Sequence, residues 1–320
     1  MEKTETINIS SNKEISTLSP GDLLSKSTLL DIFRSKILLD LSEIQLRKPD
    51  RDKKLKVLKA SSAAIMFELK ILIEKYESLG VWNKSQMTNA LLLANYVQCI
   101  SLIEMRNEIW PYDYMSFSRR IGEFWENFCK LVWEYPAIEG VEAFLPPSFE
   151  EVSASFKIRY KEVVDDLKLD EIARNTLVSS YESVWSLLGS GDINLKLDLH
   201  LKINQSFHSL DFKSGFSSNE KGNTNRLLLI GSIYNMLGRL YSCEILVRTP
   251  ESENNHYLQK LKNSKYWTVY CASDMYKIIF SYSGFNLGNW INEHVNWDLD
   301  LARPTLNYLE NNDLLRFLDW

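Results

Sequence analysis

The 320-residue sequence lacks the motifs that mark most enzyme classes. Its four cysteines, Cys99, Cys129, Cys243 and Cys271, are widely spaced, form no C-x-x-C pair and have no histidine cluster beside them. This spacing disfavours a zinc site or a disulfide framework, so we expect reduced thiols and a cytoplasmic location. The sequence also has no lysine-bearing phosphate loop, no G-x-G-x-x-G fingerprint and no G-x-S-x-G elbow, which disfavours nucleotide-dependent enzymes and serine hydrolases of the usual kinds.

Long apolar runs are missing as well. No uncharged apolar stretch reaches the length that spans a bilayer, and the N-terminal segment MEKTETINISSNKEIS has no apolar core of the kind found in signal peptides. We therefore expect a soluble protein with no membrane partner. The net charge of −5 gives no global attraction to nucleic acid, but residues 190–265 carry ten Lys or Arg against seven acids, so the basic charge is concentrated there.

The hydrophobic pattern divides the chain into three parts. Residues 1–20 are polar, and we expect them to be disordered. Residues 21–112 repeat apolar side chains at alternating spacings of three and four, which predicts a helical region. Residues 113–320 are predicted to form a mixed α/β core that contains a helical insertion at 137–190.

Local signals mark the starts of two helices. Ser148 is followed three residues later by Glu151, the spacing of a capping box, so a helix is expected to begin here. Another helix is predicted over 223–241, with Asn223 or Thr224 as its cap. Strand, helix, strand and helix patterns follow it, which favours parallel crossover units.

The clearest strand signal lies in residues 193–203. Six apolar residues alternate there with five polar ones, and after Gln205–Ser206 the alternation resumes with the opposite parity. An antiparallel hairpin with a two-residue turn requires this change of parity. The resulting register pairs Leu201 with Leu210 on the buried face.

The opposite face of this hairpin carries ionisable side chains. The predicted register places Asp198 near Lys213 and His200 near Asp211. Two carboxylates and the backbone carbonyl of Phe212 would supply the oxygen ligands that Mg²⁺ prefers. A metal held in this way polarises a phosphate oxygen and lowers the pKa of a bound water, and a nearby lysine stabilises the developing charge or orients the water. The hairpin therefore predicts phosphodiester hydrolysis.

The order of these residues resembles a known family. Asp198 is followed thirteen residues later by Asp211-Phe212-Lys213, on a hairpin that precedes a helix and a parallel strand. This pattern, over roughly residues 116–273, resembles the PD-(D/E)xK nuclease superfamily and, within it, type II restriction endonucleases; Leu197 stands where the motif usually has proline. The resemblance implies a restriction-endonuclease-like core, with a central mixed β-sheet flanked by helices. It also implies a Mg²⁺ ion bound by the two aspartates, with Lys213 positioning or activating the attacking water.

The resemblance further implies an acid from an upstream helix, here SRRIGEFWENF. Glu126 is the first candidate to complete the metal site and Glu123 the second. Because the insertion at 137–190 separates this helix from the hairpin, Glu182 on the helix just before the hairpin is a rival. Asp192 is an alternative metal ligand if the hairpin register slips.

The segment after the lysine faces DNA in the resembling enzymes. Its candidate DNA-binding residues here are Ser217, Ser218, Asn219, Lys221, Asn223, Asn225 and Arg226. Side chains of these types hold phosphates or read base edges, although the segment is equally interpretable as a polar surface loop. The resemblance implies sequence-specific cleavage of double-stranded DNA by a homodimer, with the helical region at 21–112 serving as a dimerisation element or a DNA clamp.

Two other interpretations remain open. The chain is a structure-specific or repair nuclease of the same superfamily, or it is a non-catalytic α/β binding protein in which Asp211 and Lys213 form a surface ion pair.

Overall fold

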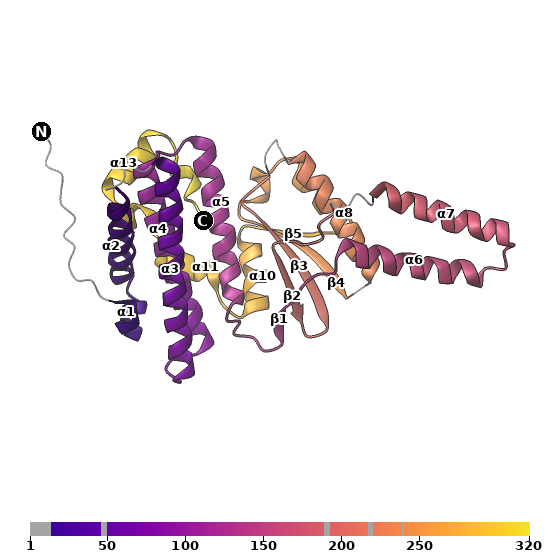
Figure 1. The fold of residues 1–320 in the computed structure, drawn as a ribbon, viewed down its shortest axis with the longest axis horizontal. Helices are drawn as coiled ribbons and strands as arrows, with labels where there is room; N and C mark the ends of the chain where they lie inside the picture. The colour runs from indigo at the N-terminus through magenta and orange to yellow at the C-terminus, as the bar shows by residue number, and fades with distance from the viewer. Residues whose placement is uncertain (1–13, 46–49, 189–192, 217–219, 239) are drawn as a thin grey trace, which may run out of the picture. The chain divides into compact units, whose positions relative to one another are not determined.

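The computed structural model describes residues 14–45, 50–188, 193–216, 220–238 and 240–320 (Figure 1). It is a mixed α/β protein, as predicted, with a five-stranded mixed sheet flanked by helices. The chain forms two compact units. The first consists of residues 1–139 and 273–320, and the second of residues 140–272.

The first unit is helical. Its elements are η1 (Ile15–Thr17), α1 (Pro20–Leu23), α2 (Lys26–Gln45), α3 (Arg51–Ser78), α4 (Lys84–Ile109), α5 (Tyr114–Lys130), η2 (Leu131–Trp133), α10 (Ser273–Ser283), α11 (Leu287–His294), α12 (Trp297–Asp300), α13 (Arg303–Asn311) and η4 (Leu315–Phe317). The side chains of Asp50, Asn83 and Asp113 cap α3, α4 and α5, each by accepting a backbone N–H of the first turn. Among the described residues, no helix combines the length and apolar character that crossing a bilayer requires.

A buried ion pair joins distant parts of the first unit. Arg34 on α2 donates from Nε and Nη2 to the two carboxylate oxygens of Glu104 on α4, at 2.8 and 2.7 Å. Nη2 also donates to the carbonyl of Asp300, at 3.0 Å, and the amide of Ala302 donates to Glu104. These contacts explain why residues 273–320 pack with the N-terminal helices, although the sequence pattern grouped them with the sheet.

The second unit contains the sheet. Its elements are β1 (Val141–Ala143), α6 (Phe149–Asp166), α7 (Glu171–Leu188), β2 (Leu199–Ile203), β3 (Ser206–Lys213), α8 (Lys221–Leu237), β4 (Tyr241–Val247), η3 (Glu251–Glu253), α9 (His256–Lys262) and β5 (Thr268–Cys271). The strands lie in the order β1-β2-β3-β4-β5; the first three are antiparallel, and β3, β4 and β5 are mutually parallel. The hairpin, the helix and the parallel strand therefore follow in the predicted order.

The predicted hairpin register is wrong by two residues. Leu201 pairs with His208, not with Leu210, and the turn consists of Asn204 and Gln205. Asn204 takes a left-handed φ of 55°, which a tight hairpin turn needs and which asparagine tolerates better than most residues.

The predicted strand at 193–203 is confirmed only from Leu199 onward. In a continued ladder, the Phe212 amide would bond to the backbone of Leu197. Instead it donates to Oδ2 of Asp198 at 2.8 Å, while the Leu197 amide donates to the His200 ring at 2.9 Å. Side chains thus replace backbone partners, and residues 193–198 leave the sheet with Leu195 and Leu197 buried.

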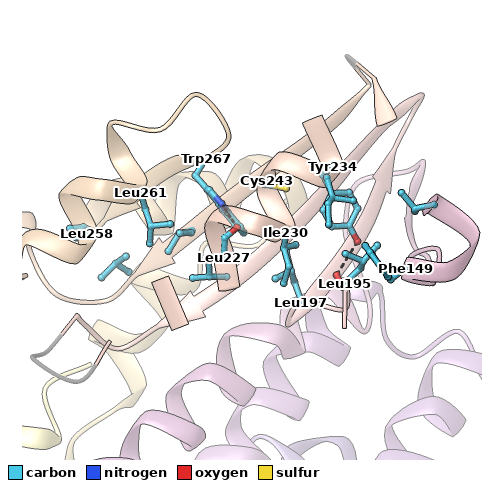
Figure 2. Packing of buried hydrophobic residues seen from close by; sticks show 14 of the residues in the cluster. Phe149, Leu195, Leu197, Leu227, Ile230, Tyr234, Cys243, Leu258, Leu261 and Trp267 are labelled. Carbon is cyan, nitrogen blue, oxygen red and sulfur yellow. Dashed lines mark hydrogen bonds between the residues drawn. The ribbon is translucent and has the colours of Figure 1, made fainter. Parts of the chain in front are cut away.

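The core of the second unit lies between the sheet and helices α8 and α9 (Figure 2). It includes Leu227 and Ile230 of α8, Leu258 and Leu261 of α9, and Trp267 just before β5. Helix α6 adds Phe149, Val152 and Phe156 to the same cluster. The predicted capping box at the start of α6 is confirmed, because Ser148 and Glu151 each accept the backbone N–H of the other.

Candidate active site

Asp198 and Asp211 lie opposite each other at the open end of the β2–β3 hairpin. Leu199 pairs with Leu210 across the two strands. Because Asp198 directly precedes Leu199 and Asp211 directly follows Leu210, the two acids are cross-strand neighbours. The sequence prediction placed Asp198 beside Lys213 and His200 beside Asp211. The observed register instead pairs His200 with Ser209 and brings the two acids together.

The Asp198 carboxylate is held by the backbone of the neighbouring strand. Its Oδ2 accepts the Phe212 amide hydrogen at 2.8 Å, which fixes this carboxylate next to Asp211. A negative charge at this position raises the pKa of the neighbouring acid. The hairpin therefore presents two closely spaced carboxylates, as metal binding by the pair requires.

Asp211 is buried, with 1% of its surface exposed. Burial raises the pKa of this carboxyl to about 6; the Lys213 ammonium lowers it, and the Asp198 carboxylate raises it further. The Asp211–Lys213 pair is therefore not a solvated ion pair on the protein surface.

Lys213 closes the site on the same strand. Its Nζ lies 2.7 Å from Oδ2 of Asp211 and donates to the Phe212 carbonyl at 3.1 Å. The lysine side chain retains 19% exposure, so its ammonium lies between a buried acid and solvent. That position suits a group that orients a water or stabilises charge on a bound phosphate.

The acids and the start of α8 are electrostatically linked. The Arg226 guanidinium lowers the pKa of Asp211, which places its charge within reach of the carboxylate. Arg226 donates to Oδ1 of Asn223, and Asn223 donates from Nδ2 to Glu220 at 3.0 Å. These hydrogen bonds make the first turn of α8 polar.

The candidate DNA-binding residues are placed differently from the prediction. Helix α8 begins at Lys221, with Glu220 at its N-cap, rather than being capped by Asn223 or Thr224. Lys221 therefore lies on the first turn of the helix and not in the loop before it, while Asn223, Asn225 and Arg226 lie on the helix that was predicted from residue 223. Ser217, Ser218 and Asn219 lie outside the described residues.

His200, which the predicted register placed near Asp211, is buried, with 5% of its surface exposed. Its Nδ1 lies 3.0 Å from the Ser209 hydroxyl, and its Nε2 accepts the Leu197 amide hydrogen. Burial lowers the pKa of His200 to about 4, and Lys196 lowers it further while Asp198 opposes this. Alternating polarity placed His200 on the face of Asp198, but it gave no sign that this face is covered.

Two of the predicted third acids form ion pairs within their own helix. Glu126 on α5 forms an ion pair with Lys130 at 2.8 Å, and Glu123 on the same helix pairs with Arg119 and Arg120 at 3.4 and 2.8 Å. Glu182 is exposed on α7, and Asp192 lies outside the described residues.

In the described part of the chain, no three or more His, Cys, Asp or Glu side chains gather to hold a metal. Asp198 and Asp211 are the described residues that could hold a Mg²⁺ ion, and waters would then complete its coordination. The close approach of Asp198 to the buried Asp211 supports this fit, because a divalent cation would relieve their mutual repulsion. The Phe212 carbonyl, the third predicted ligand, already accepts a hydrogen bond from Lys213.

Comparison of the chain with protein-family models, curated proteins and solved structures finds no match.

Proposed function

We propose that this protein is a Mg²⁺-dependent endodeoxyribonuclease that hydrolyses double-stranded DNA at specific sites, as type II restriction endonucleases do. The observation that carries the proposal is the placement of Asp198 opposite Asp211, with Lys213 2.7 Å from the buried acid. The connection from β3 through α8 to the parallel strand β4 agrees with the family pattern and supports a restriction-endonuclease-like core.

Each residue of this site has a defined task in such a reaction. Asp198 and Asp211 would hold Mg²⁺, which supplies Lewis-acid polarisation of the scissile phosphate and acidifies a bound water. Lys213, whose side chain is partly exposed, would orient the attacking water and stabilise negative charge on the phosphate. Arg226 and the exposed N-terminal turn of α8 would hold the DNA backbone, because helix N-termini and guanidinium groups both bind phosphate.

The proposal also covers the cellular location and the oligomeric state of the enzyme. All four cysteines are free thiols, in agreement with a reducing cytoplasm. A two-fold homodimer would read a palindromic site, and the helical first unit would provide the dimer interface or a clamp around the DNA. Glu126 remains the proposed third acid from α5.

A digest of long DNA of known sequence tests the proposal. The purified protein is incubated with and without Mg²⁺, beside Asp211→Asn, Lys213→Met and the control Asp274→Asn, which alters an exposed acid paired with Lys277. We expect discrete Mg²⁺-dependent fragments from the wild type and the control, and none from the two site variants. Smears in place of bands would indicate a nuclease without sequence selectivity. A folded wild type that cuts no DNA, whichever divalent metal is added, would refute the proposal.

A further inference from the structure

The segment that carries Asp198 is not part of the sheet, so other contacts must hold it in place. Residues 193–198 precede β2 and belong to no strand. Asp198 nevertheless has to keep its carboxylate beside Asp211, and a metal ligand on an untethered segment would pay a conformational-entropy cost each time it bound.

Hydrogen bonds from buried side chains tether this segment at two positions. The Leu197 amide donates to Nε2 of His200 at 2.9 Å, and the Tyr234 hydroxyl of α8 donates to the Leu195 carbonyl at 3.1 Å (Figure 2). The segment is thereby joined both to β2, which it enters, and to the helix that covers the sheet.

The two tethers belong to one directed chain. Because Nε2 of His200 accepts a hydrogen bond, the neutral ring carries its hydrogen on Nδ1, which faces the Ser209 hydroxyl at 3.0 Å. Ser209, fully buried on β3, interacts in turn with the Tyr234 hydroxyl and opposes the rise that burial causes in the pKa of Tyr234. Each hydroxyl can thus donate onward while accepting from the preceding group, which leaves no buried donor unpaired along the chain from His200 to Leu195.

We infer that His200 is a positioning residue for the metal site, which fixes the Asp198 carboxylate through Leu197 by means of the His200–Ser209–Tyr234 chain. This inference rests on the proposed function, because the effect of His200 on the metal site is measured as the Mg²⁺ concentration that cleavage requires. His200 touches neither metal nor substrate in this scheme. Groups that orient metal ligands in this indirect way typically change metal affinity by 10- to 100-fold when they are removed.

The test compares His200→Leu with His200→Gln. Leucine fills similar space but cannot accept the Leu197 hydrogen, whereas the glutamine side-chain oxygen reaches the position of Nε2 and can accept it. In His200→Leu we expect the Mg²⁺ concentration for half-maximal cleavage to rise about tenfold or more, with the cleavage rate largely restored at saturating Mg²⁺. His200→Gln should return the Mg²⁺ requirement towards that of the wild type, and the exposed His256→Gln should leave it unchanged.

A second measurement does not depend on cleavage. Hydrogen–deuterium exchange in the peptide that contains Leu197 should be slow in the wild type and in His200→Gln, and faster in His200→Leu. If the wild type cuts no DNA, the proposed function fails, and this exchange experiment still decides whether the tether exists. An unchanged Leu197 exchange rate in His200→Leu overturns the inference.

A folded His200→Leu variant with the wild-type Mg²⁺ requirement would also overturn the inference. If His200→Leu does not fold, Ser209→Ala takes its place, because it removes only the hydroxyl that links His200 to Tyr234. We then expect the Mg²⁺ requirement to rise in Ser209→Ala, and a variant that melts earlier while keeping the wild-type requirement would show a purely structural role.

Discussion

The carboxylate of Asp198 takes the place of a backbone carbonyl opposite Phe212. Its Oδ2 accepts the Phe212 amide hydrogen at 2.8 Å, at the position where the ladder between β2 and β3 would otherwise continue. The same side chain therefore ends the strand pairing and stands beside the second acid of the site. The hydrogen bond to Phe212 needs only an oxygen acceptor, whereas the proposed metal binding needs a carboxylate. Substitution of Asp198 can therefore separate the two roles.

Replacing Asp198 tests this double role. In Asp198→Ala the buried Phe212 amide loses its partner, so we expect the free energy of unfolding to fall by about 2 kcal/mol. Asp198→Asn keeps an oxygen acceptor and should lose less stability, while both variants should lose Mg²⁺-dependent cleavage. Urea unfolding and the DNA digest measure the two effects separately. Equal stability of the alanine and asparagine variants would contradict the assigned role of Oδ2.

The buried carboxyl of Asp211 predicts a pH-dependent stability. Its pKa rises from 3.8 to about 6 on folding, so between these values the folded protein holds a proton that the unfolded chain has released. This contribution is fully present below pH 3.8 and is lost as the pH rises to about 6, by at most about 3 kcal/mol.

Urea unfolding from pH 3.5 to 7.5 measures this contribution as the difference between the wild type and Asp211→Asn. Across this window the stability of the wild type relative to Asp211→Asn should fall as the pH rises, whereas Asp274→Asn should follow the wild-type curve. Parallel curves for Asp211→Asn and the wild type would contradict the raised pKa.

The contact between Gly231 and Trp267 predicts that a side chain at residue 231 destabilises the protein. The Trp267 indole donates to the Leu227 carbonyl at 2.8 Å (Figure 2). The same indole occupies the space that a Cβ at residue 231 would need. Although alanine has the better helix propensity, Gly231→Ala should lower the free energy of unfolding by about 1–3 kcal/mol. The matched control is Gly222→Ala in the same helix, where a Cβ meets no atom within 4 Å and stability should be unchanged or slightly higher.

The ion pair of Arg34 and Glu104 predicts a large loss of stability when it is broken. Glu104 retains 4% side-chain exposure, so Arg34→Met would leave a buried carboxylate without its cation and should cost about 3 kcal/mol or more. Arg316→Met removes one partner of the exposed pair with Asp313 and should cost less than about 1 kcal/mol. Thermal unfolding of both variants makes the comparison, and similar losses in the two would argue against burial as the cause.

Local patterns in the sequence predicted the site better than its surroundings. The parity change around the turn located the hairpin and the Asp211-Phe212-Lys213 strand, because side-chain alternation is a local property of a strand. The register was off by two residues, since Gln205–Ser206 and Asn204–Gln205 satisfy the same parity and only backbone conformation distinguishes them. The correct turn makes the two acids neighbours, which the predicted register did not.

Tertiary contacts set the features that the sequence analysis missed. The polar side chain of His200 follows the strand pattern, yet it is covered because Ser209 and the Leu197 amide supply its partners. The start of α8 was placed two residues late, because the predicted caps, Asn223 and Thr224, lie inside the first turn that Glu220 begins. The pairing of residues 273–320 with the N-terminal helices depends on contacts such as Arg34 with Asp300, which no local window contains.

The discontinuity of the first unit affects the order in which the protein is assembled during translation. Residues 140–272 leave the ribosome as a contiguous stretch with every strand of the described sheet, so this unit can fold while synthesis continues. The helices before residue 139 must wait for α10 to α13, and the Glu104 carboxylate has no backbone partner from Ala302 until that segment emerges. The N-terminal helices are thus the part of the nascent chain that needs protection for longest, and a chain that ended after residue 272 would contain every strand of the described sheet but only part of the helical unit.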